Sequence, residues 1–131
     1  MAVFNSVMAR SIIIRNGVHW TATDWIVQNV TATIEEHLVL GDAEKAVSRR
    51  LQPVYRDLQA VADFSEADVD ELQVLWRAAR SEYNHASRMN ADEWYEPESL
   101  PEYLSAFAQL VELLRADDRL KPDRPQGGPG S

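Results

Sequence analysis

The sequence predicts an all-α protein, an antiparallel bundle of four to five helices with one helix kinked at Pro53 and a flexible C-terminal tail. Apolar residues recur in steps of three and four along four segments, and helix-starting and helix-stopping residues separate those segments. The length of 131 residues suits one domain that can bury a core. We therefore expect a single helical domain over residues 1–120 and a Gly- and Pro-rich tail over 121–131.

Residues 1–22 admit two interpretations. A helix to about residue 15 is favoured, because the apolar residues before Gly17 have helical spacing: Val3, Phe4, Val7, Met8 and Ile12. The alternative is a β-hairpin, in which Asn16-Gly17 forms the turn between two β-branched runs. The hairpin is disfavoured because an isolated hairpin is marginally stable and no third strand is visible in the sequence.

Two helices are expected over residues 21–62. The first begins at Thr21 or Thr23, stops at Gly41 and carries the stripe Trp25, Ile26, Val30, Ile34 and Leu38. The second begins at Asp42 and carries the stripe Val47, Leu51, Val54, Tyr55, Leu58, Val61 and Ala62. Pro53 interrupts this second helix, yet the stripe stays in phase across it, which indicates a kink or two short helices sharing one face.

Two further helices follow, joined by a connector of residues 90–99. The fourth predicted helix has Ser65 as its cap, with Asp68 closing a capping box and Phe64 and Val69 forming a hydrophobic staple. Its stripe is Val69, Leu72, Leu75, Trp76, Ala79, Tyr83 and Ala86. The last helix begins with a capping box at Ser99 and Glu102, and its stripe is Leu100, Tyr103, Leu104, Phe107, Leu110, Val111 and Leu114.

The charge excludes several classes of function. The chain has 13 Lys and Arg against 21 Asp and Glu, a formal net charge of −8, which argues against binding nucleic acid or an anionic membrane. No apolar run approaches the roughly 20 residues of a membrane span, and the N-terminus does not read as a signal peptide. With no cysteine, disulfides and thiolate chemistry are excluded, and we expect a cytoplasmic protein.

No pattern indicates catalysis. Glu82 and His85 form one Glu-x-x-His, whereas a di-iron bundle site needs two such motifs and two further Glu. The three histidines lack the spacing of a ligand pair, and there is no nucleophile elbow or phosphate loop. The sequence therefore predicts a protein that is not an enzyme and that holds no metal or cofactor.

Two acidic clusters stand out, and the second carries aromatic residues. The first is Asp63, Glu66, Asp68, Asp70 and Glu71, where acids complement the dipole at a helix start. The second surrounds an aromatic pair, and we predict its residues as the partner-binding site: Asp92, Glu93, Trp94, Tyr95, Glu96 and Glu98. The alternative is that Trp94 and Tyr95 fold back over the core as a lid.

These observations favour a small acidic protein that binds another protein, with a basic partner expected. A stoichiometric inhibitor or immunity-type protein is the leading hypothesis, because a compact acidic domain without a catalytic signature suits that role. The alternatives are a structural subunit of a larger assembly and, less favoured, a metal-dependent helical-bundle enzyme built around Glu82 and His85.

Overall fold

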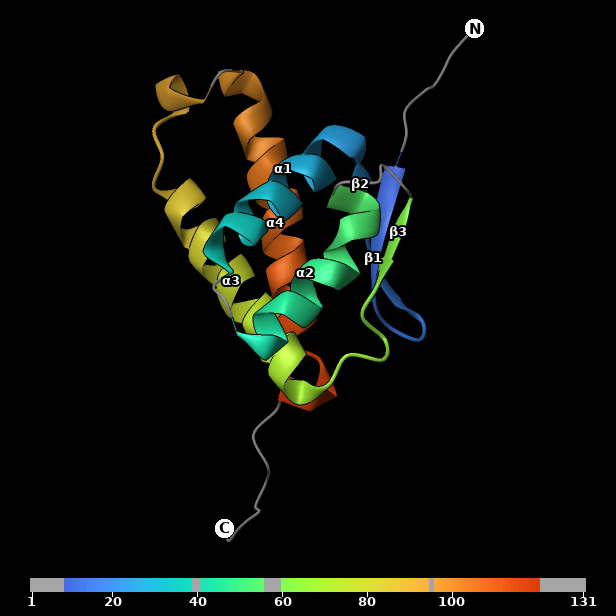
Figure 1. The fold of residues 1–131 in the computed structure, drawn as a ribbon. Helices are drawn as coiled ribbons and strands as arrows, with labels where there is room; N and C mark the ends of the chain where they lie inside the picture. The colour runs from blue at the N-terminus through green and yellow to red at the C-terminus, as the bar shows by residue number, and fades with distance from the viewer. Residues whose placement is uncertain (1–8, 39–40, 56–59, 95, 121–131) are drawn as a thin grey trace, which may run out of the picture.

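Helices and a small sheet make up the described part of the chain, in a computed structural model that covers residues 9–38, 41–55, 60–94 and 96–120 (Figure 1). The strands are β1 (Ala9–Arg15), β2 (Val18–Thr23) and β3 (Val61–Asp63). The α-helices are α1 (Asp24–His37), α2 (Asp42–Tyr55), α3 (Val69–Ser87) and α4 (Leu100–Arg115). Three short 3-10 helices complete the described elements: η1 (Ala91–Glu93), η2 (Pro97–Ser99) and η3 (Asp118–Leu120).

The sheet shows that the all-α prediction is wrong. Residues 9–23 form an antiparallel hairpin of β1 and β2 where the favoured helix was expected to continue to about residue 15, and Gly17 has a φ of 82° in the turn. The first part of that predicted helix, residues 1–8, lies outside the described residues. β3 pairs parallel with β1, so the sheet is mixed and its order is β2-β1-β3. A third strand thus supports the hairpin, which removes the objection that an isolated hairpin is marginal.

The segment that supplies β3 was expected to be helical. α2 ends at Tyr55, two residues after Pro53, and residues 56–59 lie outside the described part of the chain. Val61 is exposed and Ala62 is buried, which is the alternation of a strand and not the shared stripe expected of a helix. The prediction of a helix through Ala62 is therefore wrong.

The four predicted amphipathic helices are present, and their apolar faces form the core together with one face of the sheet. Figure 1 shows the sheet at one side of the molecule with the helices beside it. Ile12, Ile14 and Trp20 point inward from the hairpin, and the indole Nε1–H of Trp20 donates to the carbonyl of Ala106 on α4, at 2.8 Å. The hairpin is thereby tied to the last helix by a buried aromatic ring.

The start of α3 differs from the predicted capping box. Asp68 is the N-cap, and its carboxylate accepts the backbone N–H of Glu71 at 2.9 Å. Ser65 lies in the preceding turn, where its backbone N–H donates to Asp63 at 2.8 Å. Hydrogen bonds from the Ser65 side chain and, second, from this N–H lower the pKa of Asp63. Val69 is 44% exposed, so no staple closes over this turn. The helix begins three residues later than predicted, because its cap is Asp68 and not Ser65.

A charged cluster fixes the C-terminal end of the described chain. The Arg119 guanidinium donates to the carbonyls of Ile14, Phe64 and Ala67 at 2.6 to 2.9 Å, and to the carboxylate of Asp117. Asp117 is 2% exposed. η3 therefore holds β1 and the start of α3 together. The predicted flexible tail, residues 121–131, lies outside the described residues, and no helix among those described is both long and apolar enough to span a membrane.

Candidate partner-binding surface

The connector between α3 and α4 carries most of the predicted site. Asp92, Glu93, Glu96 and Glu98 are all exposed, and η1 and η2 give the segment a defined backbone. Glu93 also accepts the N–H of Asn90 at 2.9 Å, which closes η1. The carboxylates that the sequence placed at this surface are thus presented to solvent on a short, turned segment, at the end of α3 remote from the sheet (Figure 1).

Trp94 turns toward the core, which was the alternative left open by the sequence. Its ring is half-buried and lies 4.7 Å, centroid to centroid, from the ring of Tyr103. Its Nε1–H donates to the Ser99 hydroxyl at 3.0 Å, and that hydroxyl donates to the Glu96 carbonyl at 2.8 Å. Trp94 therefore anchors the connector to α4. Tyr95 lies outside the described residues, and contact of either aromatic with a partner stays a prediction.

The ring that Trp94 contacts, Tyr103, belongs to an aromatic cluster of the core. Tyr103 also contacts Trp25 and Phe107, with ring centroids 6.2 and 5.7 Å away. Burial raises the pKa of Tyr103 to about 12. Ser99 precedes α4 as predicted but makes no capping hydrogen bond with its side chain, because its hydroxyl is used within the connector. The connector is therefore held to α4 by the contact of Trp94 with Tyr103 and by the hydrogen bonds of Ser99, and the predicted capping box is not formed by the Ser99 side chain.

The other acidic cluster gains a residue that the sequence did not assign to it. Asp42, at the start of α2, joins Asp68, Asp70 and Glu71 around a pocket of about 190 Å³, which is also lined by two alanines of α2. Glu71 is paired with Arg50, with 2.6 Å between Nε and Oε1. Since α3 has 19 residues and rises about 1.5 Å per residue, this acidic pocket and the connector lie at opposite ends of the molecule.

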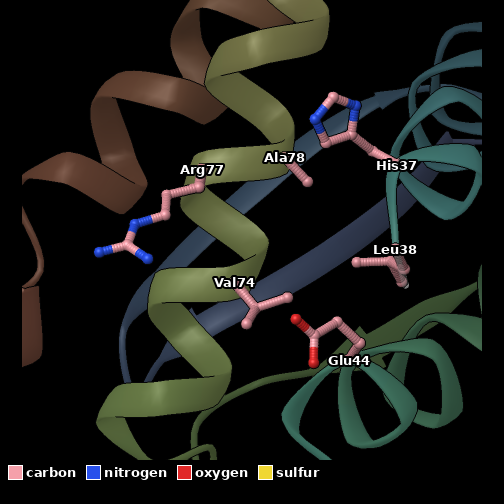
Figure 2. A pocket seen from close by; sticks show the side chains of 6 residues that line it. All are labelled: His37, Leu38, Glu44, Val74, Arg77 and Ala78. Atoms are coloured by element: carbon pink, nitrogen blue, oxygen red, sulfur yellow. The ribbon is translucent and has the colours of Figure 1, made fainter. Parts of the chain in front are cut away.

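A second hollow lies where α1, α2 and α3 meet. His37, Leu38, Glu44, Val74, Arg77 and Ala78 line it, and its volume is about 130 Å³. Figure 2 shows Val74, Ala78 and Leu38 forming its apolar walls, whereas the Arg77 guanidinium extends away from the other side chains. Because Arg77 points away from His37 and Glu44, the charged side chains of this hollow do not form a shared binding or catalytic site.

The histidines and carboxylates do not assemble as a metal enzyme would require. His37 Nδ1 lies 2.8 Å from Glu82 Oε2, so Glu82 is paired across to α1. His85 is exposed and lines a different hollow, with Arg88, Met89 and Glu93. In the described ranges, no group of three His, Asp or Glu side chains could hold a metal ion. The sequence spacing of Glu82 and His85 is therefore not matched by a shared site.

Comparison with known proteins gives one informative likeness. No protein-family model and no curated protein matches this chain. A similar chain occurs in the solved structure described as the CdiA-CT toxin from Burkholderia pseudomallei E479 in complex with its cognate CdiI immunity protein. The match has a TM-score of 0.66 and 18% identity, and covers 86% of this chain and 99% of that one. At this identity the likeness establishes a shared fold.

Proposed function

We propose that this protein is an immunity-type protein, a non-enzymatic inhibitor that binds a basic protein partner in a stoichiometric complex. The observation that carries the proposal is the exposed carboxylate surface of the connector, residues 90–99, which contains no Lys or Arg. A surface of one sign of charge speeds diffusional encounter with a partner of the opposite sign and disfavours like-charged partners. The net charge of −8 acts in the same direction.

Contacts within this chain hold the described residues of the connector, 90–94 and 96–99, in place. The Trp94 ring packs against Tyr103 at a tilt of 37° and is hydrogen-bonded to Ser99, so the neighbouring carboxylates of Asp92 and Glu93 are carried on a backbone that is held to α4. Binding through a fixed segment loses less conformational freedom than binding through a flexible one. In this proposal Trp94 positions the acidic side chains, while Asp92, Glu93, Glu96 and Glu98 pair with Lys or Arg of the partner.

The fold likeness supports the same class of function. The similar chain belongs to a complex between a toxin and its cognate immunity protein. A fold of this kind therefore takes part in at least one toxin–immunity pair. The acidic charge of the present chain favours the inhibitor role, in which a small protein masks a basic surface of its target.

The proposal is tested by finding the partner and measuring where it binds. Affinity capture from the native lysate identifies the partner, and calorimetry then gives stoichiometry and dissociation constant. Glu96→Gln combined with Glu98→Gln should weaken binding about tenfold, mainly by slowing association, and this effect should shrink at high salt. The partner's own activity should fall to zero at one equivalent of this protein.

A matched control removes the same charge at the other end of α3. Glu66 and Asp70 are exposed, so Glu66→Gln with Asp70→Asn alters the net charge equally without touching the Asp68 cap. This control should bind within about twofold of wild type. A larger loss in the control than in the connector variant would move the site to the acidic pocket. Growth arrest on expressing this chain alone would refute the inhibitor role.

A further inference from the structure

The outer edge of the sheet at β2 presents backbone groups that no described residue satisfies. Ser11 N–H donates to the Ala60 carbonyl, and the Ile13 carbonyl accepts from Phe64 N–H, both at 2.7 Å, so these groups of β1 face β3. Backbone groups of successive residues in a strand point to opposite sides, and the groups of Ile12 therefore face β2, where its register partner is Trp20.

This register determines which groups of β2 point outward. Trp20 directs its N–H and C=O toward β1, so the neighbouring His19 and Thr21 direct theirs away from the sheet. β2 is a terminal strand, and among the described residues no hydrogen bond reaches the backbone of His19 or Thr21. Both side chains are exposed, which leaves the edge accessible.

The edge also lacks the features that normally prevent strand pairing. β2 contains no Lys, Arg, Asp, Glu or Pro, although charges and prolines are the usual protection of an exposed edge strand. Its conformation is fixed on the inner side by Trp20, which is 1% exposed, and on the outer face by the Ser11–Thr21 hydroxyl contact of 2.8 Å. The strand therefore carries no Lys, Arg, Asp or Glu, and contacts on both of its faces hold it in place.

We propose that β2 is a self-association edge that pairs antiparallel with β2 of a second copy of this chain. The distribution of charge is the reason for expecting a second copy of this chain at this edge. β1 and β2 carry no carboxylate in a chain with 21 Asp and Glu, and the two arginines of β1 are paired with Asp24, Asp117 and Asp118. The strand β2 itself therefore offers a basic partner no carboxylate to pair with. A second acidic copy, in contrast, meets least repulsion where carboxylates are absent, and a twofold arrangement lets identical edges satisfy each other.

The geometry of the pairing follows from the register. With the twofold axis at Trp20, His19 of each copy lies opposite Thr21 of the other, and the outward groups form about four hydrogen bonds. The two three-stranded sheets then become one continuous sheet. The acidic connector is at the end of α3 remote from the sheet, so self-association leaves it exposed (Figure 1).

Sedimentation equilibrium of the purified chain, from about 1 µM to about 1 mM, tests the proposal. The mass should rise toward twice the monomer mass within this range, and the His19 and Thr21 amides should gain protection from hydrogen exchange as it does. Thr21→Lys should raise the dissociation constant at least about tenfold, because it places like charges at the pairing edge. Thr21→Val, which loses the hydroxyl contact but adds no charge, should still associate.

Val61→Lys is the matched control, since Val61 is 43% exposed on the opposite edge strand of the same sheet. It should leave the dissociation constant unchanged, and circular dichroism should show every variant folded. A chain that remains monomeric throughout the range overturns the proposal. So does an association weakened by Val61→Lys and not by Thr21→Lys, or amide protection at His19 and Thr21 that appears only with a foreign partner.

Discussion

Replacing Arg119 with methionine should destabilise this protein more than most single substitutions. The Arg119 guanidinium satisfies the carbonyls of Ile14, Phe64 and Ala67 and pairs with Asp117, so it joins three segments that are far apart in sequence. Arg119→Met keeps the length of the aliphatic stem and removes every one of these bonds. The buried carboxylate of Asp117 would then keep the backbone N–H of residue 119, at 2.9 Å, but the nearest cation would be Arg15, whose Nε is 3.9 Å away.

The expected loss is about 3 kcal/mol in the free energy of unfolding. Breaking a buried ion pair by removing one partner costs about 3–5 kcal/mol, because the remaining charge stays buried. The lower figure applies here because the Arg119 side chain is 21% exposed, which lets water reach part of the vacated site. Urea unfolding followed by circular dichroism measures the change, which is a large part of the 5–15 kcal/mol typical of a domain.

A double variant separates the charge effect from simple loss of packing. Asp117→Asn together with Arg119→Met removes the stranded charge, so its cost should be smaller than the sum of the two single costs. The reasoning would be refuted if Arg119→Met lost less than about 1 kcal/mol, or if the two single effects simply added.

The same cluster predicts how stability depends on pH. Burial by itself would raise the pKa of Asp117, but hydrogen bonds and the charges of Arg119 and Arg15 outweigh it and hold that pKa below its ordinary value of 3.8. A carboxyl with a lowered pKa in the folded state adds stability above its unfolded pKa and loses it as the pH falls through the folded pKa. Asp117→Asn should therefore flatten the loss of stability below about pH 4.

Three further predictions concern the connector and the hairpin. Trp94→Ala should cost about 2 kcal/mol, because a half-buried ring and its bond to Ser99 are lost; a change below about 0.5 kcal/mol would mean that the ring does not pack on Tyr103. In an ultraviolet titration, one tyrosine should ionise only near pH 12, and stability should fall as the pH rises above the ordinary tyrosine pKa of 10.0, a fall that Tyr103→Phe removes. Gly17→Ala should cost about 1 kcal/mol by thermal melting, since the turn needs φ of 82° and no neighbouring atom would clash; an unchanged midpoint would refute this backbone argument.

The helices could be predicted because their signal is local. Stripes such as Leu100, Tyr103, Phe107, Leu110 and Leu114 repeat at helical spacing, and each of these residues is buried in α4. The sheet could not be predicted in the same way. β3 has only three residues, too few for a periodic pattern, and it forms because β1 offers an edge at Ser11, Ile12 and Ile13. Because this third strand could not be recognised in the sequence, the hairpin at Asn16-Gly17 was disfavoured.

The candidate partner-binding surface was also predictable only in its local features. Exposure of the connector carboxylates was readable from composition, since charged residues in a turn-rich segment remain in solvent. The orientation of Trp94 was not readable, because it depends on Tyr103 and Ser99 lying beneath it. The burial of Asp117 was not readable either, because it depends on Arg119 and on Arg15, which the fold brings to it from β1.

The chain by itself determined the four helices, the acidic exterior and the absence of thiol chemistry, because these depend on residue type and on spacing within a few turns. Tertiary structure decided the sheet, the role of Trp94 and the Arg119 cluster. Each of these joins segments that are distant in sequence, and the free energy that stabilises them arises only when those segments meet.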